Sequence, residues 1–523
     1  MRSNAVLIFL TLGFCSCAIG SRILGLFPVP IRSHYVFYEK LLVALSSRGH
    51  TVDVITHFPS GETIKNFNEL SVAGSMPTLE NNISIADHDW KTIVHYALEF
   101  ANMGNDACTS VLKHPLIQEL KTPSKQYDLV ITEMFVTDCL LPYAHIYKAP
   151  IIGISSTGIM PWADERMGNP DNPAYIPNYF LPLRGKLNFV EKCFSTMMNI
   201  ASKAWYHVIL TLPAEIRGRE VFGDMPPIEN IAKDTMLLLA NRHFSLDDPR
   251  PLVPGVIEIG GMHIDAPKQI IPEKLATFVE KSQDGVVYFS MGTLINMKTF
   301  SPESLKTILQ VFSTLKQNVV MKLPKDALDN LTQPKNVYIA DTLPQLDVLC
   351  HPNTKLFITH GGLLSIQEAA YCGTPIIGMP FHPHQEVNVK NYVDKMAGVQ
   401  LDYSYLDATN FQDAINTVMN NETYKTHAVK LSNIFKDRLI PPLDAAVYWT
   451  EYAMKHGGQH IRSLSADLII FEYLLIDIVV LGVALWLIGM YVFYMVLQFL
   501  QELFDRPPPP KYVKNEEKQS KND

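Results

Sequence analysis

One short stretch of the chain concentrates glycines and polar side chains in a way that suits an anionic ligand. It runs from Phe357 to Gln385 and reads FITHGGLLSIQEAAYCGTPIIGMPFHPHQ. An apolar strand pattern ends at His360, Gly361 and Gly362 follow, and a helical pattern begins directly after them. Glycines let backbone N–H groups approach a ligand closely, and a helix N-terminus offers unpaired donors and partial positive charge. This order of elements predicts a site for an anion such as a diphosphate.

Three further polar residues stand at the ends of predicted strands. His34 follows the first apolar run, at the start of a helical pattern, and Glu133 and Asp138 follow a strand predicted at 128–132. In open parallel sheets, ligands meet the carboxyl ends of the strands. By its position, His34 is therefore either a ligand-facing histidine or a solvated surface histidine.

Hydrophobic periodicity supplies the elements that position these residues. The N-terminal half shows strand patterns at 23–27, 51–56, 128–132 and 150–155, with a helical spacing of apolar residues between the first two. The C-terminal half shows strand patterns at 285–294, 318–324, 336–341 and 356–360. We expect two α/β domains in series, each built on a parallel sheet. Pro and Gly are frequent between Val253 and Gln283, which predicts the junction there.

Composition limits the class of protein. The chain has 523 residues and a formal net charge of −8, which gives no electrostatic case for nucleic-acid binding. Two of the seven cysteines lie in the first 20 residues, and the other five are an odd, scattered set. We read these five as neither a metal site nor a disulfide framework.

Two apolar segments predict a membrane-anchored, lumenal protein. Residues 1–20 read as a secretory signal peptide with cleavage near Ser21. Residues 478–500 carry no charge and are long enough to span a bilayer. Arg506 and four lysines follow, which predicts a short cytoplasmic tail at 501–523 and a type I topology. Sequons at Asn82, Asn330 and Asn421 are compatible with a glycoprotein.

Taken together, these motifs closely resemble the UDP-glycosyltransferases, membrane-anchored enzymes that move a sugar from a UDP-sugar to small lipophilic acceptors. The resemblance is carried by the stretch quoted above, RSHY, NRHFSLDDPRPLVPGVIEIGGMH, GVVYFSMGT, LPQLDVLCHP, the apolar span and the basic tail. The sequences of these motifs are most similar to those of insect members of the family. It implies a GT-B fold, in which two Rossmann-like domains face each other across a cleft, followed by a transmembrane helix. The expected segments are a signal peptide at 1–20, an acceptor-binding domain at 21–255, a UDP-sugar-binding domain at 256–460, a membrane-proximal segment at 461–477, the transmembrane helix at 478–500 and the tail.

The resemblance also implies residue roles. His34 is the expected general base, with a carboxylate beside it to fix its tautomer. Glu368 is expected at the ribose, Gln345 at the uracil and Gln385 at the sugar. The residues expected at the diphosphate are His360, Gly361, Gly362, Ser290, Gly292 and Ser365. The implied reaction uses the UDP-sugar as co-substrate, with no metal and no other cofactor.

Four positions depart from the family pattern as the resemblance presents it. The acidic partner of His34 is either Asp138, which we favour slightly, or Glu133. Thr342 stands where many relatives stack a Trp on uracil. Leu364 replaces a polar Asn near the phosphates, and His384 replaces an acidic residue near the sugar.

The expected activity is therefore hexose transfer, with glucose as the first choice, to a hydroxyl of small lipophilic compounds, with inversion and in a detoxification role at the endoplasmic reticulum membrane. A pseudoenzyme that binds lipophilic molecules without transfer is the alternative, supported by Thr342, Leu364 and His384. The acceptor pocket is expected from residues 58–90 and 160–194. Homo-oligomers are compatible with the family, although no motif indicates them.

Overall fold

The structure is a computed structural model, and it describes residues 20–80, 90–121, 125–266, 271–328, 331–508. The predicted signal peptide up to residue 19, the sequons at Asn82 and Asn330 and the tail from residue 509 lie outside these ranges. The chain divides into two units, Met1–Ala466 and Asp467–Asp523, which are taken in turn.

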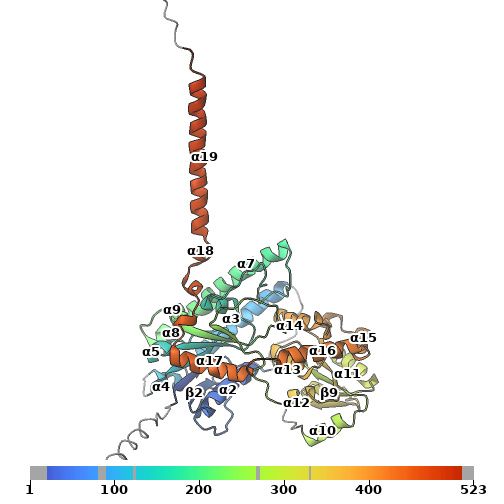
Figure 1. The fold of residues 1–523 in the computed structure, drawn as a ribbon. Coiled ribbons are helices and arrows are strands. Elements are labelled where there is room, and N and C mark those ends of the chain that lie inside the picture. The colour runs from blue at the N-terminus through green and yellow to red at the C-terminus, as the bar shows by residue number, and fades with distance from the viewer. Residues whose placement is uncertain (1–19, 81–89, 122–124, 267–270, 329–330, 509–523) are drawn as a thin grey trace, which may run out of the picture. The chain divides into compact units, whose positions relative to one another are not determined.

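The first sheet of the larger unit is parallel, with the order β3-β2-β1-β4-β5-β6-β7 in the described chain (Figure 1). Its strands are β1 (Arg22–Leu26), β2 (Thr51–Thr56), β3 (Phe67–Ser71), β4 (Leu129–Glu133), β5 (Ile151–Ser155), β6 (Thr235–Ala240) and β7 (Val256–Glu258). Every residue of β4, β5 and β6 is buried, as expected for a parallel sheet covered on both faces. The chain order changes direction between β1 and β4, which is where such sheets bind ligands.

Helices of the N-terminal half surround this sheet. They are α2 (Arg32–Ser47), α3 (Trp90–Leu112), α4 (Pro115–Leu120), α5 (Pro142–Tyr147), α6 (Pro161–Met167), α7 (Phe189–Trp205), a π-helical turn η1 (Tyr206–Thr211), α8 (Leu212–Phe222) and α9 (Ile228–Lys233). The predicted helix after the first strand is α2, and its apolar residues Phe37, Leu41, Leu42 and Leu45 are fully buried against the sheet. This confirms the periodicity argument.

The second sheet repeats the same winding, with the order β10-β9-β8-β11-β12-β13. Its strands are β8 (Val286–Ser290), β9 (Asn318–Lys322), β10 (Val337–Ala340), β11 (Thr354–Thr359), β12 (Ile376–Gly378) and β13 (Gly398–Gln400). The helices are α10 (Glu273–Glu280), α11 (Pro302–Thr314), α12 (Gln345–Leu349), α13 (Leu363–Cys372), α14 (Pro383–Val393), α15 (Ala408–Met419), α16 (Glu422–Lys436) and α17 (Pro442–His456). Four short 3-10 turns complete this half: η2 (Met297–Thr299), η3 (Lys325–Leu328), η4 (Tyr403–Tyr405) and η5 (Gln459–Ile461). The direction changes between β8 and β11, at the glycine-rich stretches singled out above.

The expected limits of the second domain, residues 256 and 460, both need correction. Strand β7 begins at Val256 but pairs with β6, so it belongs to the first sheet. Helix α17 follows the second domain in sequence but packs against α2 and β6, and Ala446, Val447 and Ala453 join the core of the first domain. The chain thus crosses between the domains twice, because α17 buries its apolar face on the first sheet.

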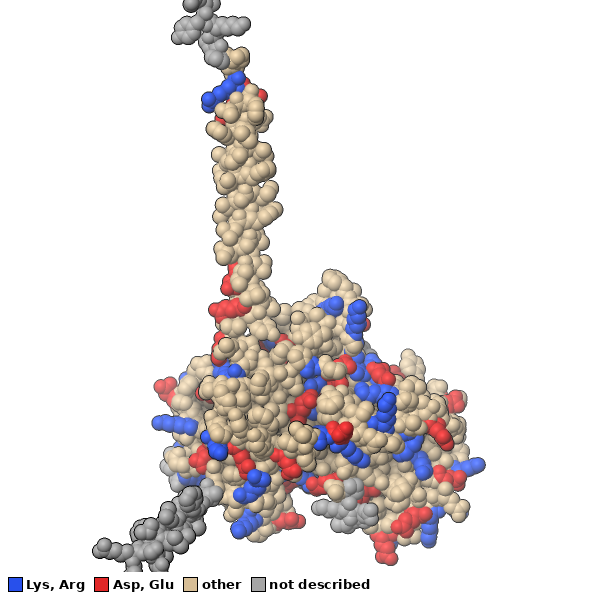
Figure 2. Space-filling view, viewed as in Figure 1, with Lys and Arg blue, Asp and Glu red and all other residues tan. Residues whose placement is uncertain are grey.

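The smaller unit contains the predicted membrane span. Helix α19 (Ile476–Phe504) includes residues 478–500, and among the described residues it is the one helix long and apolar enough to cross a bilayer, with a mean hydropathy of 2.3. Figure 2 shows Lys, Arg, Asp and Glu only toward its two ends. The membrane-proximal segment before it is broken into η6 (Leu464–Asp467) and α18 (Ile470–Tyr473), and Leu475 has a φ of 52°. The membrane-proximal segment is therefore not one continuous helix.

Candidate active site

The carboxyl ends of both sheets open onto one cavity of about 1250 Å³. The first domain contributes His34 and Ser156 to its wall, and the second contributes Gly292, His360 and Glu368. Residues of the predicted acceptor segment 160–194 line it as well, whereas Glu80 is the one residue of segment 58–90 in the described wall. The ligand-binding edges of two Rossmann-like sheets therefore share one space.

A buried carboxylate lies beside His34. Nδ1 of His34 is 2.9 Å from Oε1 of Glu133, somewhat off the line of an ideal hydrogen bond. His34 is 7% and Glu133 6% exposed, and Ser156 donates a short hydrogen bond from its hydroxyl to the same Oε1. The geometry follows from the topology, because His34 lies in the first turn of α2, the helix that follows β1, and Glu133 ends the neighbouring strand β4.

The slight preference for Asp138 as the partner of His34 does not match this geometry. The Asp138 carboxylate accepts two hydrogen bonds from Arg166, at 3.2 and 2.8 Å, and one from the Tyr206 hydroxyl at 2.6 Å. All three residues are buried. Asp138 thus forms an ion pair in the interior of the first domain, and it does not cap α5, which begins only at Pro142.

Glycines hold the ring of His360 at the switch point of the second sheet. A Cβ built on Gly292 would lie 2.5 Å from Cε1 of His360, and one on Gly362 would lie 2.5 Å from its Nε2, so neither position tolerates a side chain without a shift. Gly361 has a φ of 86°, in the region that favours glycine. Burial, with smaller contributions from the charges of His384 and Lys322, lowers the pKa of His360 to about 3, so the imidazole is neutral.

Gln345 and Glu368 meet beside these glycines. Nε2 of Gln345 donates to Oε2 of Glu368 at 2.6 Å and to Oγ of Ser365 at 3.0 Å. Burial raises the pKa of Glu368 to about 7, although Gln345 and the charge of Lys322 oppose that shift. On the other side of the glycine turn, Ser290 Oγ accepts a hydrogen bond from the backbone N–H of Gly292 at 3.4 Å. Most of the expected donor-site residues therefore line one cavity, whereas Ser290 and Gly361 are not part of its described wall.

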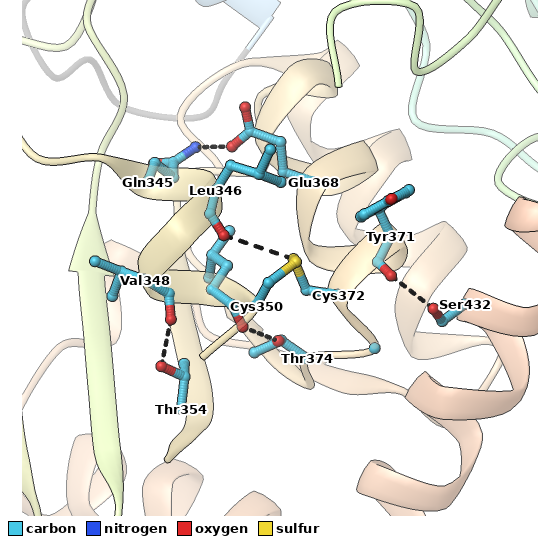
Figure 3. Close-up of a disulfide and its surroundings, with 12 residues drawn as sticks. Gln345, Leu346, Val348, Cys350, Thr354, Glu368, Tyr371, Cys372, Thr374 and Ser432 are labelled. Carbon is cyan, nitrogen blue, oxygen red and sulfur yellow. Dashed lines mark hydrogen bonds between the residues drawn. A yellow bond between two sulfur atoms is a disulfide. The ribbon is translucent and has the colours of Figure 1, made fainter. Parts of the chain in front are cut away.

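A disulfide ties together the two helices that carry Gln345 and Glu368 (Figure 3). It joins Cys350, directly after α12, to Cys372, the last residue of α13. The expectation that the cysteines form no disulfide is thus wrong. The sequence separation of 22 residues gave no signal, and only the packing of α12 on α13 brings the two Cα atoms to 4.6 Å.

The substituted positions fall at different places in the site. Thr342 is exposed in the cavity wall. Leu364 packs against the core of the first domain, so it serves the contact between domains. The His384 ring stacks on that of Tyr179 at 6.1 Å, and burial, followed by the charge of His34, lowers the pKa of His384 to about 4. Gln385 is buried at the cavity, and its Oε1 accepts from the backbone N–H of Phe381 at 2.9 Å.

Lys322, which the sequence interpretation missed, is a partly buried cation that lines the cavity together with His360 and Glu368. It is the last residue of β9, and its Nζ donates to the Gly292 carbonyl at 2.9 Å. Burial lowers its pKa, while the charges of Glu80 and Glu368 partly restore it. Its place at the carboxyl end of a strand was the available signal, because that edge binds the ligand.

A chain of hydrogen bonds connects the donor helix α13 to the acid beside His34. Nε2 of Gln367 donates to Oδ1 of Asn241 at 2.8 Å, and Nδ2 of Asn241 donates to the Ser156 carbonyl at 2.6 Å. Ser156 in turn holds Glu133. Gln367 and Asn241 are fully buried, so the link fixes α13 against the ends of β5 and β6. Neither residue was singled out from the sequence.

Comparisons with known proteins agree with this architecture. The family model described as "UDP-glucoronosyl and UDP-glucosyl transferase" matches residues 31–506. The chain is 36% identical to UDP-glycosyltransferase UGT5 of Dactylopius coccus, over 90% of each chain, and 35% identical to UDP-glucosyltransferase 2 of the same insect, over 88% of this chain and 89% of the relative. It is 28% identical to UDP-glucuronosyltransferase 2B1 of Rattus norvegicus, over 86% of this chain and 87% of the relative.

Solved structures show the same fold at low sequence identity. The glycosyltransferase of kitacinnamycin superposes with a TM-score of 0.57 at 18% identity, covering 83% of this chain and 98% of that chain. Spinosyn forosaminyltransferase SpnP gives 0.56 at 15% identity, covering 83% and 100%. The two parallel Rossmann-type sheets around one cavity are thus the GT-B glycosyltransferase fold. With a family model that matches nearly its whole length, the chain belongs to the UDP-glycosyltransferase family and is a glycosyltransferase that uses a UDP-sugar.

Proposed function

We propose that this enzyme transfers a hexose, with glucose as the first choice, from a UDP-sugar to a hydroxyl of small lipophilic acceptors. The observation that carries the proposal is that His34, which pairs with the buried Glu133, lines the same cavity as His360 and Glu368. A base and a donor site on opposite walls of one cavity are what a direct displacement requires. The name UDP-glucosyltransferase of one insect relative supports glucose.

In the proposed reaction, His34 acts as the general base. Its Nδ1 lies at Glu133, which leaves Nε2 to accept the proton of the acceptor hydroxyl. The acceptor oxygen forms a bond to the anomeric carbon while the bond from that carbon to the UDP oxygen breaks on the opposite side, so the configuration inverts. The electron pair leaves with UDP, and the Glu133 carboxylate stabilises the imidazolium.

The donor wall supplies groups of the right kind for UDP. Lys322 and the backbone N–H groups at the start of α13 would counter the charge of the diphosphate, which grows as UDP leaves. Glu368 would accept hydrogen bonds from the ribose hydroxyls, and Gln345 would contact the uracil. His384 and Gln385 also line the cavity, and in this scheme they would contact the hexose. In this scheme the UDP-sugar is a co-substrate, and no metal and no other cofactor takes part.

The same proposal places the catalytic unit in the lumen of the endoplasmic reticulum. A disulfide is typical of oxidising compartments, and α19 has the length and composition of a membrane anchor. A cleaved signal peptide and a short cytoplasmic tail complete the type I topology. An anchored enzyme would meet lipophilic compounds that concentrate in the bilayer, which fits a role in detoxification.

The experiment that tests the function is acceptor-dependent release of UDP. The purified chain is offered UDP-glucose, UDP-glucuronic acid, UDP-galactose and UDP-N-acetylglucosamine, each with a panel of phenols and alcohols. We expect release with UDP-glucose, and its loss in His34→Ala but not in the control His427→Ala, which alters a partly exposed histidine on α16. Release from another donor would overturn glucose, and release that survives His34→Ala would overturn the base. UDP binding without release from any donor or acceptor would favour the non-catalytic alternative.

A further inference from the structure

Helix α7 has an unusual distribution of polarity, because its polar side chains face the protein. Ser195 and Ser202 are buried. Ser195 Oγ accepts a hydrogen bond from the backbone N–H of Asn178 at 2.9 Å, and Ser202 Oγ accepts one from the side-chain amide of Asn178 at 3.3 Å. Asn199 donates to the Asp171 carboxylate at 2.9 Å and lines the cavity of the active site. A surface helix of a globular protein normally buries its apolar face.

The opposite face of α7 is apolar and exposed, and the exposed apolar residues continue along η1 and α8. Phe189, Val190 and Met197 are 79%, 73% and 66% exposed. The further exposed apolar residues of this face are Phe194, Ile200, Val208, Ile209, Leu212 and Ile216. Contiguous apolar surface of this extent marks an interaction site in a folded protein. We call it the α7 face.

The chain itself indicates what covers the α7 face. The last residues of the larger unit are held beside α6, where Ser465 Oγ donates to the Gly168 carbonyl at 2.6 Å. Gly168 ends α6, and α6 packs against α7. From Ala466 to the first residue of α19, Ile476, the chain can extend at most about 35 Å. Leu464, next to the exit point, is 85% exposed.

We propose that the α7 face lies in the lipid–water interface of the membrane that α19 crosses. This inference rests on the membrane anchoring in the proposed function, and it adds a second contact with the bilayer. Helices that lie in the interface bury their apolar side about 5–10 Å into the headgroup region. The inward side of α7 lines the cavity, so one helix would separate the active site from lipid, and a lipophilic acceptor would enter beside it without crossing water.

The chain carries its own reporter for this contact. Cys193 is an exposed free cysteine on α7, whereas Cys108 and Cys139 are buried. With Cys15 and Cys17 replaced by Ser, the full-length protein in lipid nanodiscs is labelled at Cys193 with a polarity-sensitive fluorophore. Quenching is measured with lipids spin-labelled near the headgroup.

Two matched variants, both with Cys193→Ser, separate the contact from the anchor. Lys316→Cys places the label on an exposed position of the second domain, and Leu487→Cys places it within α19. We expect blue-shifted, quenched emission at position 193 and within α19, and solvent-like emission at position 316. Introducing Met197→Glu and Ile200→Glu should reduce quenching at position 193 to the level at position 316.

Each other result overturns the inference in a recognisable way. Solvent-like emission at position 193 with quenching in α19 would leave the anchor in place but remove the lipid contact. Blue-shifted emission at position 193 that lipid spin labels do not quench would show a protein surface, such as a second copy of the chain, on the α7 face. Absence of quenching in α19 as well would remove the anchor on which the inference rests.

Discussion

Replacing Lys322 by Met should weaken UDP much more than uridine. Lys322 is the cation that the structure places in the donor wall, with Nζ 2.9 Å from the Gly292 carbonyl. Met keeps most of the apolar stem and removes the charge, so the variant tests the charge rather than the packing. Uridine has no phosphate, which makes it the internal control for the shape of the nucleoside site.

The magnitude follows from the kind of contact. A hydrogen bond to a charged group contributes about 1.5–3 kcal/mol, and two unit charges about 4 Å apart interact by about 4 kcal/mol at an effective dielectric constant of about 20. Lys322 already donates to a carbonyl and has a lowered pKa, so the smaller range is the better guide. A loss of about 2–3 kcal/mol corresponds to roughly 30–150-fold weaker binding of UDP.

Calorimetric titration of the purified protein with uridine, UMP and UDP measures this without knowledge of the acceptor. We expect no change for uridine, a moderate loss for UMP and the full loss for UDP. Lys322→Arg should recover much of the UDP affinity, and Lys316→Met, at an exposed position of the same domain, should change nothing. Equal weakening of uridine and UDP would mean that Lys322 only supports the fold, and unchanged UDP binding would refute the charge argument.

Three more predictions follow from the site. Glu133→Gln should lower kcat by about 100-fold or more with little loss of stability. Asp138→Asn should destabilise the fold by about 3–5 kcal/mol, because it leaves a buried guanidinium without its carboxylate. Thermal unfolding and kcat are measured for both variants, and equal behaviour of the two would contradict this prediction. Ribose hydroxyls would favour the ionised form of Glu368, whose pKa is about 7. UDP should therefore bind more weakly as the pH falls below 7, and its binding should release a proton from Glu368. Calorimetry in buffers of different ionisation enthalpy should show this proton release, and Glu368→Gln should abolish the contribution of Glu368. Cys372→Ala opens a loop of 22 residues and should cost about 3 kcal/mol of stability; an unchanged melting temperature under both oxidising and reducing conditions would argue against the disulfide.

Local patterns in the sequence were sufficient for the elements and for the donor wall. The strand predicted at 51–56 coincides with β2. The glycines around His360 could be recognised from the sequence, because a position with no room for a side chain requires glycine itself. The membrane helix followed from a run of uncharged residues that needs no partner to be recognised.

Pairings between distant residues were decided only by the tertiary structure. Glu133 and Asp138 lie at and just after the end of the same strand, and the sequence could not separate them. Asp138 forms an ion pair with Arg166 and accepts a hydrogen bond from Tyr206, which lie 28 and 68 residues away. The disulfide, the Gln367–Asn241 link and the return of α17 to the first domain likewise depend on contacts across the fold. The sequence by itself thus determined the two α/β domains, the apolar span and the glycine-rich turn around His360, since periodicity and backbone sterics are local. Which acid lies beside His34 and which cation lies near Glu368 depend on how charges are buried, and only the packed structure shows them.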